Sequence, residues 1–384
     1  MRVALHCPYS LSRPGGVQGQ VLGLARALRA RGHEAVVLAP ADADAASTAP
    51  GVGLDPAALV VVGRGVPVPA NGSVAPVALW PGAAVRAARA VAAGHFDVVH
   101  LHEPLAPGDG YGVLLAGAGP KVGTFHRAGG SAAYRLFRVP ARHALARLAV
   151  RAAVSAEAEA TVREALGGEY VIVPNAVELE RYDTARPWPE EGSPDGVVLF
   201  VGRHEQRKGL EVLLEAFGRL APGDHGGPRL WVAGDGPATA ELRRRFPPAD
   251  RIAWLGVVPD DELAARLAAA DVLCAPSLYG ESFGVVLLEA MAARTAIVAS
   301  DLPGYAAVAG DVARLVPPGN VDALAEALGA ALGEARRGTG ASAPEALDRA
   351  ARAAARWSMT AQAARYLELY EEAIGRTGAG TLAR

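Results

Sequence analysis

The sequence has little cysteine and no long apolar run. Cys7 and Cys274 are the only cysteines among 384 residues, and each lies within a short apolar stretch. This pattern argues against a disulfide framework and against a cysteine-based zinc site. No segment reaches the roughly 18 consecutive apolar residues of a membrane-spanning helix. The N-terminal residues lack the apolar core and the cleavage site of a signal peptide, so we expect a cytoplasmic protein.

An excess of charge of one sign is also absent. The chain has 38 basic and 40 acidic residues, and its formal net charge is −2. Binding of nucleic acid without regard to sequence needs a broad basic field, so we expect no nucleic-acid partner. Lysine is nearly missing, because every basic residue except Lys121 and Lys208 is an arginine. A lysine that persists against this background is a candidate for a specific role.

The chain does contain repeated strand and helix signals in a globular composition. Apolar residues make up 51% of it, and at about 100–200 residues per domain its length predicts two domains. Short Val-rich runs alternate with helical segments, which is typical of strands buried on both faces of a parallel sheet. The predicted strands are residues 3–7, 35–39, 59–63, 97–101, 121–125, 147–155, 170–173, 197–202, 229–234, 251–256, 271–277, 296–300 and 313–317. The predicted helices are residues 17–30, 131–146, 209–220, 237–246, 260–269, 284–293 and 321–334. The fold class is therefore α/β, with two doubly wound halves.

A segment rich in Pro, Gly and acidic residues separates the halves. The predicted parts are, in order, a domain of residues 1–182, a linker of residues 183–196, a domain of residues 197–356, a helical segment of residues 357–375 and a frayed tail of residues 376–384. Residues 333–346 are predicted to form a surface loop. Two similar α/β halves imply a cleft between them, with ligands at the carboxyl ends of the strands.

The first strand-to-helix connection contains two adjacent glycines. Gly15 and Gly16 precede the helix at residues 17–30, where a close backbone approach and free N–H groups favour an anion. A tight turn is the alternative interpretation. The spacing is not the G-x-G-x-x-G of dinucleotide-binding proteins, and no acidic residue ends a second strand. Both facts argue against a nicotinamide-dependent dehydrogenase.

The connection VGRHEQRKG follows the first strand of the second half. Arg203 and Lys208 lie in it, at the predicted carboxyl edge of the sheet, where two cations can neutralise a diphosphate. A solvated basic loop is the alternative interpretation. The retained lysine favours the binding site, because a compact ammonium group behaves differently from a guanidinium group.

The segment GESFGVVLLEA contains two carboxylates eight residues apart. Glu281 lies in the loop before a predicted helix, and Glu289 lies inside that helix. A helix-capping glutamate and an exposed glutamate are the alternatives. The helix is apolar nearly all round, so a carboxylate within it requires partners. Its start presents backbone donors suited to an anion at Ser282, Phe283, Gly284 and Val285.

Histidines mark the ends of two strands in the first half. His126 follows the strand at residues 121–125, at an edge where it can hydrogen-bond a substrate or transfer a proton. His100 and His102 alternate by two and so face one side of the sheet. Because only Glu103 is near enough in the sequence to complete a ligand set, we expect no metal site.

Taken together, these motifs resemble a known family. In order along the chain they are GGVQ, TFH, VGR…RKGL, WVAGDGP, DDEL, ADVLCAPS and GESFGVVLLEAMA. Their order resembles that of the retaining glycosyltransferases of family 4, which have the GT-B fold, from Met1 to about Ile374. The stretches PGGVQ, NGSVA and FDVVHLHEPLAP resemble in particular the actinobacterial phosphatidylinositol mannosyltransferases. Those enzymes transfer mannose from GDP-mannose to the inositol ring of a membrane lipid.

The resemblance implies two Rossmann-like domains that face a central cleft. The N-terminal domain would bind the acceptor, the C-terminal domain would bind the nucleotide sugar, and the C-terminal helix would pack back on the N-terminal domain. The expected partners are a nucleotide sugar and a hydroxyl acceptor. No metal or other cofactor is expected, because fixed cations and helix N-termini stabilise the charge of the leaving diphosphate.

The resemblance also assigns roles to individual residues. The catalytic positions are Arg203 and Lys208 at the phosphates, Glu281 at the sugar hydroxyls and His126 near the reacting sugar. The donor-binding positions are Gly16 at the diphosphate, Asp260 at the base, Glu289 at the ribose, and Ser282, Phe283, Gly284 and Val285 at the helix start. The acceptor-binding positions that it assigns are Tyr9 and Gln18, and Arg127, which departs from the family pattern, is the further candidate for binding a phosphate-bearing acceptor.

The chain departs from the family pattern where lipid-acting members have a lysine-rich amphipathic helix. The matching residues 82–94 carry only Arg86 and Arg89. At about 1 kcal/mol for each basic residue near an anionic surface, we expect a weak peripheral contact with the inner face of the plasma membrane.

Further departures concern the base and the acceptor. Leu263 stands where relatives have a base-contacting lysine, and Arg127, Arg135 and Arg138 stand where they have a Ser/Thr/Lys pattern. The alternative functions are the same fold with a UDP-sugar and a soluble acceptor, and a nucleotide-binding protein without transferase activity. Nothing in the sequence indicates an oligomeric state.

Overall fold

The computed structural model describes residues 1–70, 73–117, 119–129, 138–189, 193–220, 226–247 and 251–382. The chain divides into two compact units. Unit 1 comprises Met1–Ala176 and Met359–Arg384, and unit 2 comprises Val177–Ser358. The predicted linker at residues 183–196 lies inside unit 2, since the chain crosses between the units at residues 176/177 and again at 358/359.

Unit 1 is built on a seven-stranded parallel sheet. Its strands are β1 (Arg2–His6), β2 (Glu34–Ala39), β3 (Leu59–Val61), β6 (Val98–His102), β7 (Lys121–Phe125), β8 (Val150–Ala153) and β9 (Val171–Ile172). Their order across the sheet is β3-β2-β1-β6-β7-β8-β9. The reversal of strand order between β1 and β6 is the switch point at which doubly wound folds bind ligands.

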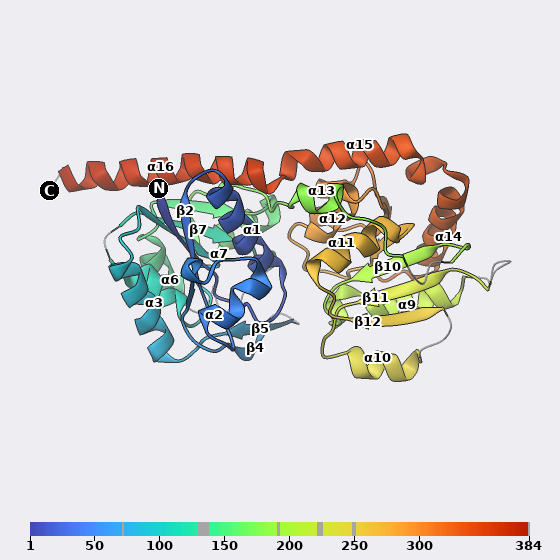
Figure 1. Cartoon of the computed structure of the whole chain (residues 1–384), viewed down its shortest axis with the longest axis horizontal. Coiled ribbons are helices and arrows are strands. Elements are labelled where there is room, and N and C mark those ends of the chain that lie inside the picture. Colours follow the sequence, from blue (N-terminus) through green and yellow to red (C-terminus); the bar gives the residue numbers. More distant parts are fainter. Residues whose placement is uncertain are drawn as a thin grey trace. The chain divides into compact units, whose positions relative to one another are not determined.

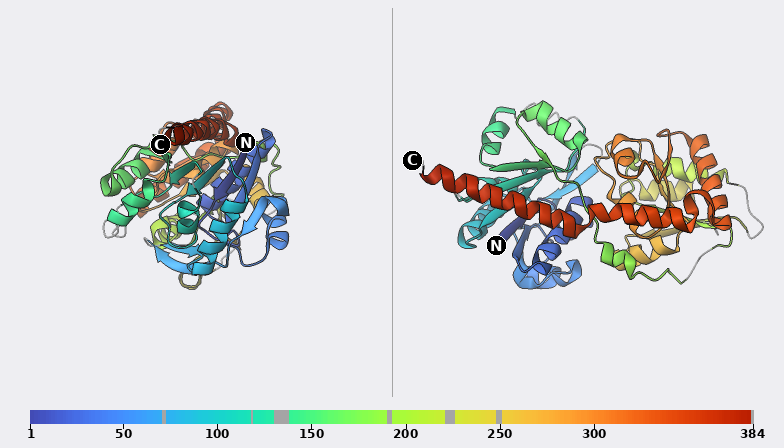
Figure 2. Two further views of the ribbon diagram at one scale, coloured as in Figure 1. Left: turned by 90° about the vertical axis from the view of Figure 1, so that its left-hand side faces the viewer. Right: turned by 90° about the horizontal axis from the view of Figure 1, so that it is seen from above.

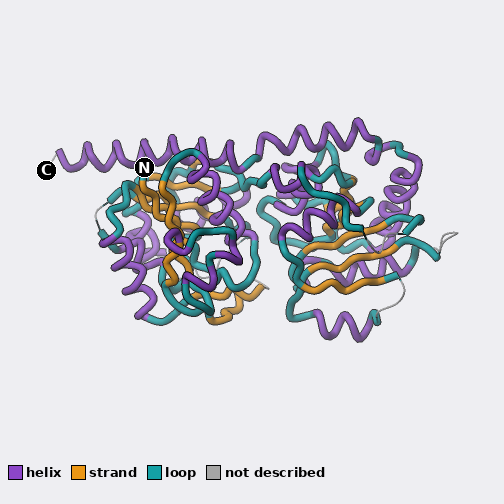
Figure 3. The backbone as a smooth tube through the Cα atoms, in the orientation of Figure 1, coloured by secondary structure: helices purple, strands orange, loops and turns teal. Residues whose placement is uncertain are grey.

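Helices cover both faces of this sheet (Figures 1 and 3). The longer ones are α1 (Gly16–Ala30), α3 (Pro81–Ala93), α4 (Gly110–Leu115), α6 (Arg138–Leu145), α7 (Ala156–Leu166) and α16 (Met359–Leu382). Apolar residues of α1 and α16 form one core with the sheet, and those of α3, α4, α6 and α7 form the core on the other face. The short helix α2 (Ala45–Thr48) and a hairpin of β4 (Val66–Ala70) and β5 (Ser73–Val77) complete the unit.

Unit 2 repeats this plan with a six-stranded parallel sheet. Its strands are β10 (Val197–Val201), β11 (Arg229–Ala233), β12 (Ile252–Gly256), β13 (Val272–Ala275), β14 (Ala296–Ser300) and β15 (Arg314–Val316), in the order β12-β11-β10-β13-β14-β15. Its helices are α8 (Leu179–Asp183), α9 (Leu210–Gly218), α10 (Thr239–Arg245), α11 (Asp260–Ala269), α12 (Val285–Ala292), α13 (Pro303–Ala309), α14 (Val321–Arg337) and α15 (Pro344–Ala354). Residues of α11, α12, α13 and α15 fill one core, and those of α9, α10 and α14 fill the other.

The C-terminal helix α16 lies along unit 1, as predicted (Figures 1 and 2). Two buried tyrosines attach it to the sheet: the Tyr370 hydroxyl lies 2.8 Å from His100 Nδ1, and the Tyr366 hydroxyl lies 2.9 Å from Thr124 Oγ1. The prediction of a frayed tail from residue 376 is wrong as far as Leu382, where α16 ends. Arg376 donates to the Ala149 carbonyl at 2.8 Å and pairs with Glu372, which supports the helix in this region.

Every predicted strand is present, and most of them lie within two residues of their predicted bounds. Both cysteines are buried in the cores, as predicted, and burial raises the pKa of the Cys7 thiol to about 12. The surface loop predicted at residues 333–346 is largely wrong. Helix α14 continues to Arg337 and ends at Gly338, whose φ is +63°, and α15 already begins at Pro344. Of the helix predicted at residues 131–146, the first seven residues lie outside the described part of the chain.

Candidate functional site

The candidate donor site of unit 2 begins in the loop between β10 and α9. Arg203 follows β10, and a single 3₁₀ turn at Gln206–Lys208 leads into the helix. Gly209 ends this turn with φ +68°, and a Cβ there would lie 1.9 Å from the Pro276 carbonyl oxygen. The Arg207 carbonyl accepts from the Leu278 N–H at 2.7 Å. This loop is therefore fixed against the loop that follows β13.

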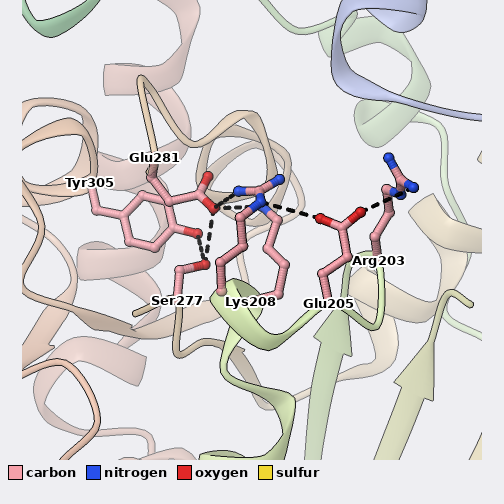
Figure 4. Close-up of polar contacts among 7 residues, drawn as sticks. Arg203, Glu205, Lys208, Ser277, Glu281 and Tyr305 are labelled. Carbon is pink, nitrogen blue, oxygen red and sulfur yellow. Dashed lines mark hydrogen bonds and ion pairs between the residues drawn. The ribbon is translucent and has the colours of Figure 1, made fainter. Parts of the chain in front are cut away.

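Three donors converge on one carboxylate oxygen, Glu281 Oε1 (Figure 4). Lys208 Nζ donates to it at 2.7 Å, Arg207 Nη1 at 3.0 Å and Ser277 Oγ at 3.1 Å. The second oxygen of Glu281 is directed away from Lys208 and Ser277 in Figure 4. Glu281 is thus held by its neighbours through one oxygen, while the other can accept hydrogen bonds from a ligand.

Tyr305 contacts Ser277, one of the three residues that donate to Glu281. Its hydroxyl lies 2.9 Å from Ser277 Oγ. Burial and the Glu281 carboxylate raise the pKa of Tyr305 well above its usual value, so the hydroxyl stays protonated. Gly284, with φ +93°, precedes α12, and a Cβ there would lie 2.5 Å from the Tyr305 ring. The ring and the start of α12 are therefore in direct contact.

A second carboxylate, Glu205, joins the two arginines of the loop. Its Oε1 lies 3.0 Å from Arg203 Nη2, and its Oε2 accepts from Arg207 Nε at 3.2 Å. The Glu205 side chain is only 1% exposed, whereas that of Arg203 is 38% exposed. The guanidinium group of Arg203 is accordingly held from inside the protein and open to solvent on its outer side.

The start of α12 carries the remaining residues of the GESFG motif. Phe283 is buried in the core of unit 2, whereas Ser282, Gly284 and Val285 are only partly buried. Val285 and Val286 are the first two residues of α12, so their N–H groups have no carbonyl within the helix to bind. The helix N-terminus thus adds partial positive charge to the three cations of the site.

Glu289, one turn further along α12, belongs to a separate polar group. Burial raises the pKa of Glu289 to about 7, and the Asp260 carboxylate adds to this shift. Arg181 and a hydrogen bond with Tyr182 lower the pKa of Glu289 and so oppose the shift. Asp260, the first residue of α11, is 68% exposed and lies 2.6 Å from Arg181 Nη1. The predicted ribose and base positions are therefore brought together beside α8.

The raised pKa of Glu289 predicts a pH-dependent contribution to stability. Between the ordinary glutamate pKa of 4.5 and about 7, the folded chain keeps a proton that the unfolded chain loses. The stabilisation of the folded chain by protonated Glu289 is complete below pH 4.5 and is lost as the pH rises towards 7. Between pH 5 and pH 8 this ionisation lowers the free energy of unfolding of the unchanged protein. Because Glu289→Gln has no carboxyl group to ionise there, its free energy of unfolding should fall by about 1–3 kcal/mol less over the same range.

Urea denaturation of both proteins at pH 5 and pH 8 measures this difference. Glu326→Gln, at an exposed position of α14, is the matched control and should keep the original pH dependence. Equal pH dependence in the Glu289→Gln variant and the unchanged protein would show that Glu289 ionises normally.

In unit 1, the GGVQ motif lies at the start of α1. Gly16 is the first residue of the helix, and a Cβ there would meet no atom within 4 Å. Gly16 is exposed, and the side of the residue that a Cβ would occupy is open. Gln18 is buried, and its Nε2 donates to the carbonyls of Ser10 (3.3 Å) and Arg13 (3.1 Å). Gln18 thus holds the loop before α1, a role that the sequence did not indicate.

The other predicted acceptor residues lie near one another at the ends of β1 and β7. Burial and the Glu103 carboxylate raise the pKa of Tyr9, and the nearby Arg127 opposes this rise. Glu103 Oε1 accepts from the backbone N–H of His126 at 2.6 Å. Unit 1 thus brings together Tyr9, Glu103, His126 and Arg127. Arg135, predicted from the sequence to lie in the loop after His126, is outside the described residues.

The histidines of this region form a buried, uncharged chain. His102 Nδ1 lies 2.9 Å from His126 Nε2, and His100 binds Tyr370 and Thr124 through its two nitrogens. Burial lowers the pKa of His126 to about 4 and that of His100 to about 3. Because its pKa is this low, His126 is a neutral hydrogen-bonding group at physiological pH. Within the described ranges, no group of three or more His, Cys, Asp or Glu side chains is arranged to hold a metal ion.

Several residues of these sites were not found from the sequence. They are Glu205, Arg207, Ser277 and Tyr305 around Glu281, and Arg181 and Tyr182 around Glu289. Of these residues, only Arg207 could have been identified from the sequence, because it is adjacent to Lys208 in the same basic loop.

Comparison with known proteins agrees with this architecture. The family model "Glycosyltransferase Family 4" matches residues 14–181, and "Glycosyl transferases group 1" matches residues 195–334. A solved glycosyltransferase from Rickettsia africae superposes with a TM-score of 0.71 at 17% identity, over 97% of this chain and 98% of that one. Anabaena HepE, solved with UDP and glucose, gives a TM-score of 0.71 at 18% identity, over 97% and 99%. Fold and family models together define a glycosyltransferase with the GT-B fold.

A more specific relationship comes from sequence identity. The phosphatidyl-myo-inositol mannosyltransferase of Mycobacterium leprae is 41% identical over 340 residues, which are 86% of this chain and 87% of that protein. The chain belongs to the family of the phosphatidyl-myo-inositol mannosyltransferases, within glycosyltransferase family 4.

Proposed function

We propose that this enzyme transfers mannose from GDP-mannose, with retention of configuration, to an inositol-containing lipid at the inner face of the plasma membrane. The observation that carries the proposal is the 41% identity, over most of both chains, to a phosphatidyl-myo-inositol mannosyltransferase. The cation–carboxylate group around Glu281 supports the chemistry, because cleavage of a sugar–phosphate bond leaves negative charge on the diphosphate.

In the proposed reaction, unit 2 binds the donor. Arg203 and Lys208 bind the diphosphate, and the N-terminus of α12 adds N–H donors. These groups lower the free energy of the transition state most, since there the leaving diphosphate gains charge and the sugar becomes oxocarbenium-like. We propose that side-chain cations provide this stabilisation without a metal ion. Undiminished turnover in the presence of EDTA would agree with it.

The two glutamates of the motif have separate tasks in this proposal. Glu281 accepts hydrogen bonds from the mannose hydroxyls through Oε2, because Lys208, Arg207 and Ser277 all donate to Oε1. Glu289 accepts from the ribose hydroxyls. Asp260, exposed at the start of α11, accepts from the N–H groups of guanine.

Unit 1 binds the acceptor in this proposal. Tyr9 and His126 contact the inositol ring, and Arg127 contacts the lipid phosphate. Gly16, the first residue of α1, contributes its amide to the donor diphosphate. His126 is neutral, and its Nε2 already lies 2.9 Å from His102 Nδ1, so a hydroxyl of the acceptor would bind at Nδ1 or compete with that contact.

An exposed apolar surface on α4, on α3 and on the two residues that precede α3 supports a membrane contact. It comprises Leu79, Trp80, Val85, Tyr111 and Leu115, whose exposed fractions run from 38% to 71%. The two helices pack against each other, so these side chains lie on neighbouring elements. Among the described residues, no helix combines the length and the apolar character needed to cross a bilayer. We propose that this surface contacts the lipid, with Arg86 and Arg89 adding weak electrostatic attraction.

Trp80, 71% exposed, is the residue on which this contact depends most. Partial burial of an indole in the bilayer interface contributes about 1–2 kcal/mol. We therefore expect Trp80→Ser to weaken binding to phosphatidylinositol-containing vesicles about five- to thirtyfold in sedimentation assays. The control is Ile172→Ser at the edge strand β9, where the side chain is 44% exposed, and it should bind as the unchanged protein does. Equal binding by both variants would contradict the proposed surface.

The donor base is tested by the thermal shift of the protein with GDP, UDP, ADP and TDP. The proposal predicts the largest increase in melting temperature with GDP, because a ligand stabilises the folded state according to its affinity. A larger shift with UDP would contradict GDP-mannose as donor and favour the alternative, a UDP-sugar with a soluble acceptor. The alternative has to be tested because Leu263, in α11, stands where relatives have a base-contacting lysine.

A further inference from the structure

We propose that Glu205 is a positioning residue: it fixes the Arg203 guanidinium for the departing diphosphate, at the expense of the net positive charge of the site. The proposal deepens the proposed function and rests on it, because it assumes that Arg203 binds the donor phosphates. The observations that carry it are the burial of Glu205 and its contacts with two arginines.

The geometry shows that Glu205 acts from inside the protein. Its side chain is 1% exposed, and its two oxygens contact different guanidinium groups: Arg203 Nη2 at 3.0 Å and Arg207 Nε at 3.2 Å. Figure 4 shows the Glu205 carboxylate between Arg203 and the group around Lys208. Arg203, at 38% exposure, is the only one of these two arginines that is widely open to solvent; Arg207 is 17% exposed.

The backbone around Glu205 is also fixed. Its N–H donates to the Arg203 carbonyl at 2.8 Å, and its carbonyl accepts from the Lys208 N–H at 2.9 Å. The backbone of Glu205 is therefore held in the turn that carries Lys208, and burial of its side chain restricts where the carboxylate can lie. Arg203, which has the long flexible side chain, is the partner that becomes ordered.

Glu205 lowers the positive charge of the site, so a site built only to attract a diphosphate would not contain it. Arg203, Arg207 and Lys208 contribute three positive charges, and Glu205 and Glu281 contribute two negative charges, which leaves one net positive charge. A buried carboxylate next to a diphosphate site weakens the attraction of the anion. The same carboxylate limits the positions that the Arg203 guanidinium can take, and placement governs transition-state stabilisation.

Glu205 weakens the binding of the anion but improves the placement of Arg203. Because these effects have opposite signs, GDP affinity and turnover together distinguish a positioning role from a purely structural one. In Glu205→Gln the net charge rises by one, so the Kd for GDP should stay unchanged or fall about two- to tenfold. The amide offers one acceptor oxygen where the carboxylate offers two, and it carries no charge, so the contact that holds Arg203 is weakened and kcat should fall about ten- to a hundredfold. A structural defect would instead weaken GDP binding in parallel with turnover and lower the melting temperature.

The experiment measures the Kd for GDP by calorimetry and kcat by release of GDP from GDP-mannose, in full-length variants. Glu205→Asp keeps the charge and shortens the side chain, so its kcat should fall while its Kd for GDP stays within about twofold of the original. The control is Glu211→Gln in the first turn of α9, which removes the same charge at a 45% exposed position and should change neither quantity.

A double-mutant cycle with Arg203→Ala completes the test. If Glu205 acts through Arg203, adding Glu205→Gln to Arg203→Ala should lower kcat no more than about twofold further. A fully additive loss, a Kd that rises with the loss of kcat, or turnover within twofold of the original in Glu205→Gln would each overturn the inference. If the unchanged protein prefers UDP to GDP, the proposed donor is wrong, and the same series with UDP still tests Glu205.

Discussion

Replacing Lys208 with alanine is expected to lower kcat about 10²- to 10³-fold while the fold persists. Removal of one preorganised charge from a site that stabilises a developing anion has effects of this size. Lys208 is partly exposed, and Glu281 would keep its bonds from Arg207 and Ser277, so little stability should be lost. Glu281→Ala should lower kcat to a similar extent, since it removes the acceptor for the sugar hydroxyls and the carboxylate that Lys208 and Arg207 both contact.

Turnover is measured as release of nucleoside diphosphate, and the fold by thermal denaturation. The matched control is Arg219→Ala at the end of α9, where an exposed cation pairs with Asp322. Its kcat should match that of the unchanged enzyme. Near-normal turnover in Lys208→Ala or Glu281→Ala would show that the site is assigned to the wrong residues.

Replacing Gly209 with alanine should destabilise the protein by about 2–4 kcal/mol. The residue has φ +68°, where a Cβ is strained, and the added Cβ would lie 1.9 Å from the Pro276 carbonyl oxygen. Because Pro276 precedes Ser277 and Gly209 follows Lys208, the displaced backbone would also separate the groups that meet at Glu281. We therefore expect a loss of activity larger than the loss of folded protein explains.

Chemical denaturation measures the first effect, and turnover per folded molecule the second. Gly218→Ala, at the last residue of the same helix, is the control, because a Cβ there meets no atom within 4 Å. That variant should be as stable as the original or slightly more stable, since alanine favours helix over glycine. Equal stability of the Gly209 and Gly218 variants would mean that the two loops are not in the described contact.

The strands were predictable because strands buried on both faces of a parallel sheet must be apolar throughout, and runs such as residues 197–201 and 296–300 stand out for that reason. Helix ends were less predictable. Helix α14 includes Gly333 and ends only at Gly338, whose φ is +63°, and the glycine-rich stretch does not show by itself which glycine ends the helix.

The site was predictable only in part, for a related reason. Two lysines stood out equally in the sequence, yet Lys208 binds Glu281, whereas Lys121 donates to the carbonyls of Gly117 and Gly119. Glu205 lies between charged neighbours in a loop, where spacing does not show which side chain turns inward. Burial in the folded chain decides that, so the partners of the predicted residues emerged only from the structure.

The most direct test of the proposed function is the product formed on lipid vesicles. The protein is incubated with GDP-mannose and vesicles containing phosphatidylinositol, and the lipids are then analysed by mass spectrometry. We predict that phosphatidylinositol gains one hexose, with release of an equal amount of GDP, and that UDP-glucose gives no such product. Unmodified phosphatidylinositol with GDP-mannose, alongside transfer from a UDP-sugar to a soluble hydroxyl acceptor, would contradict the account.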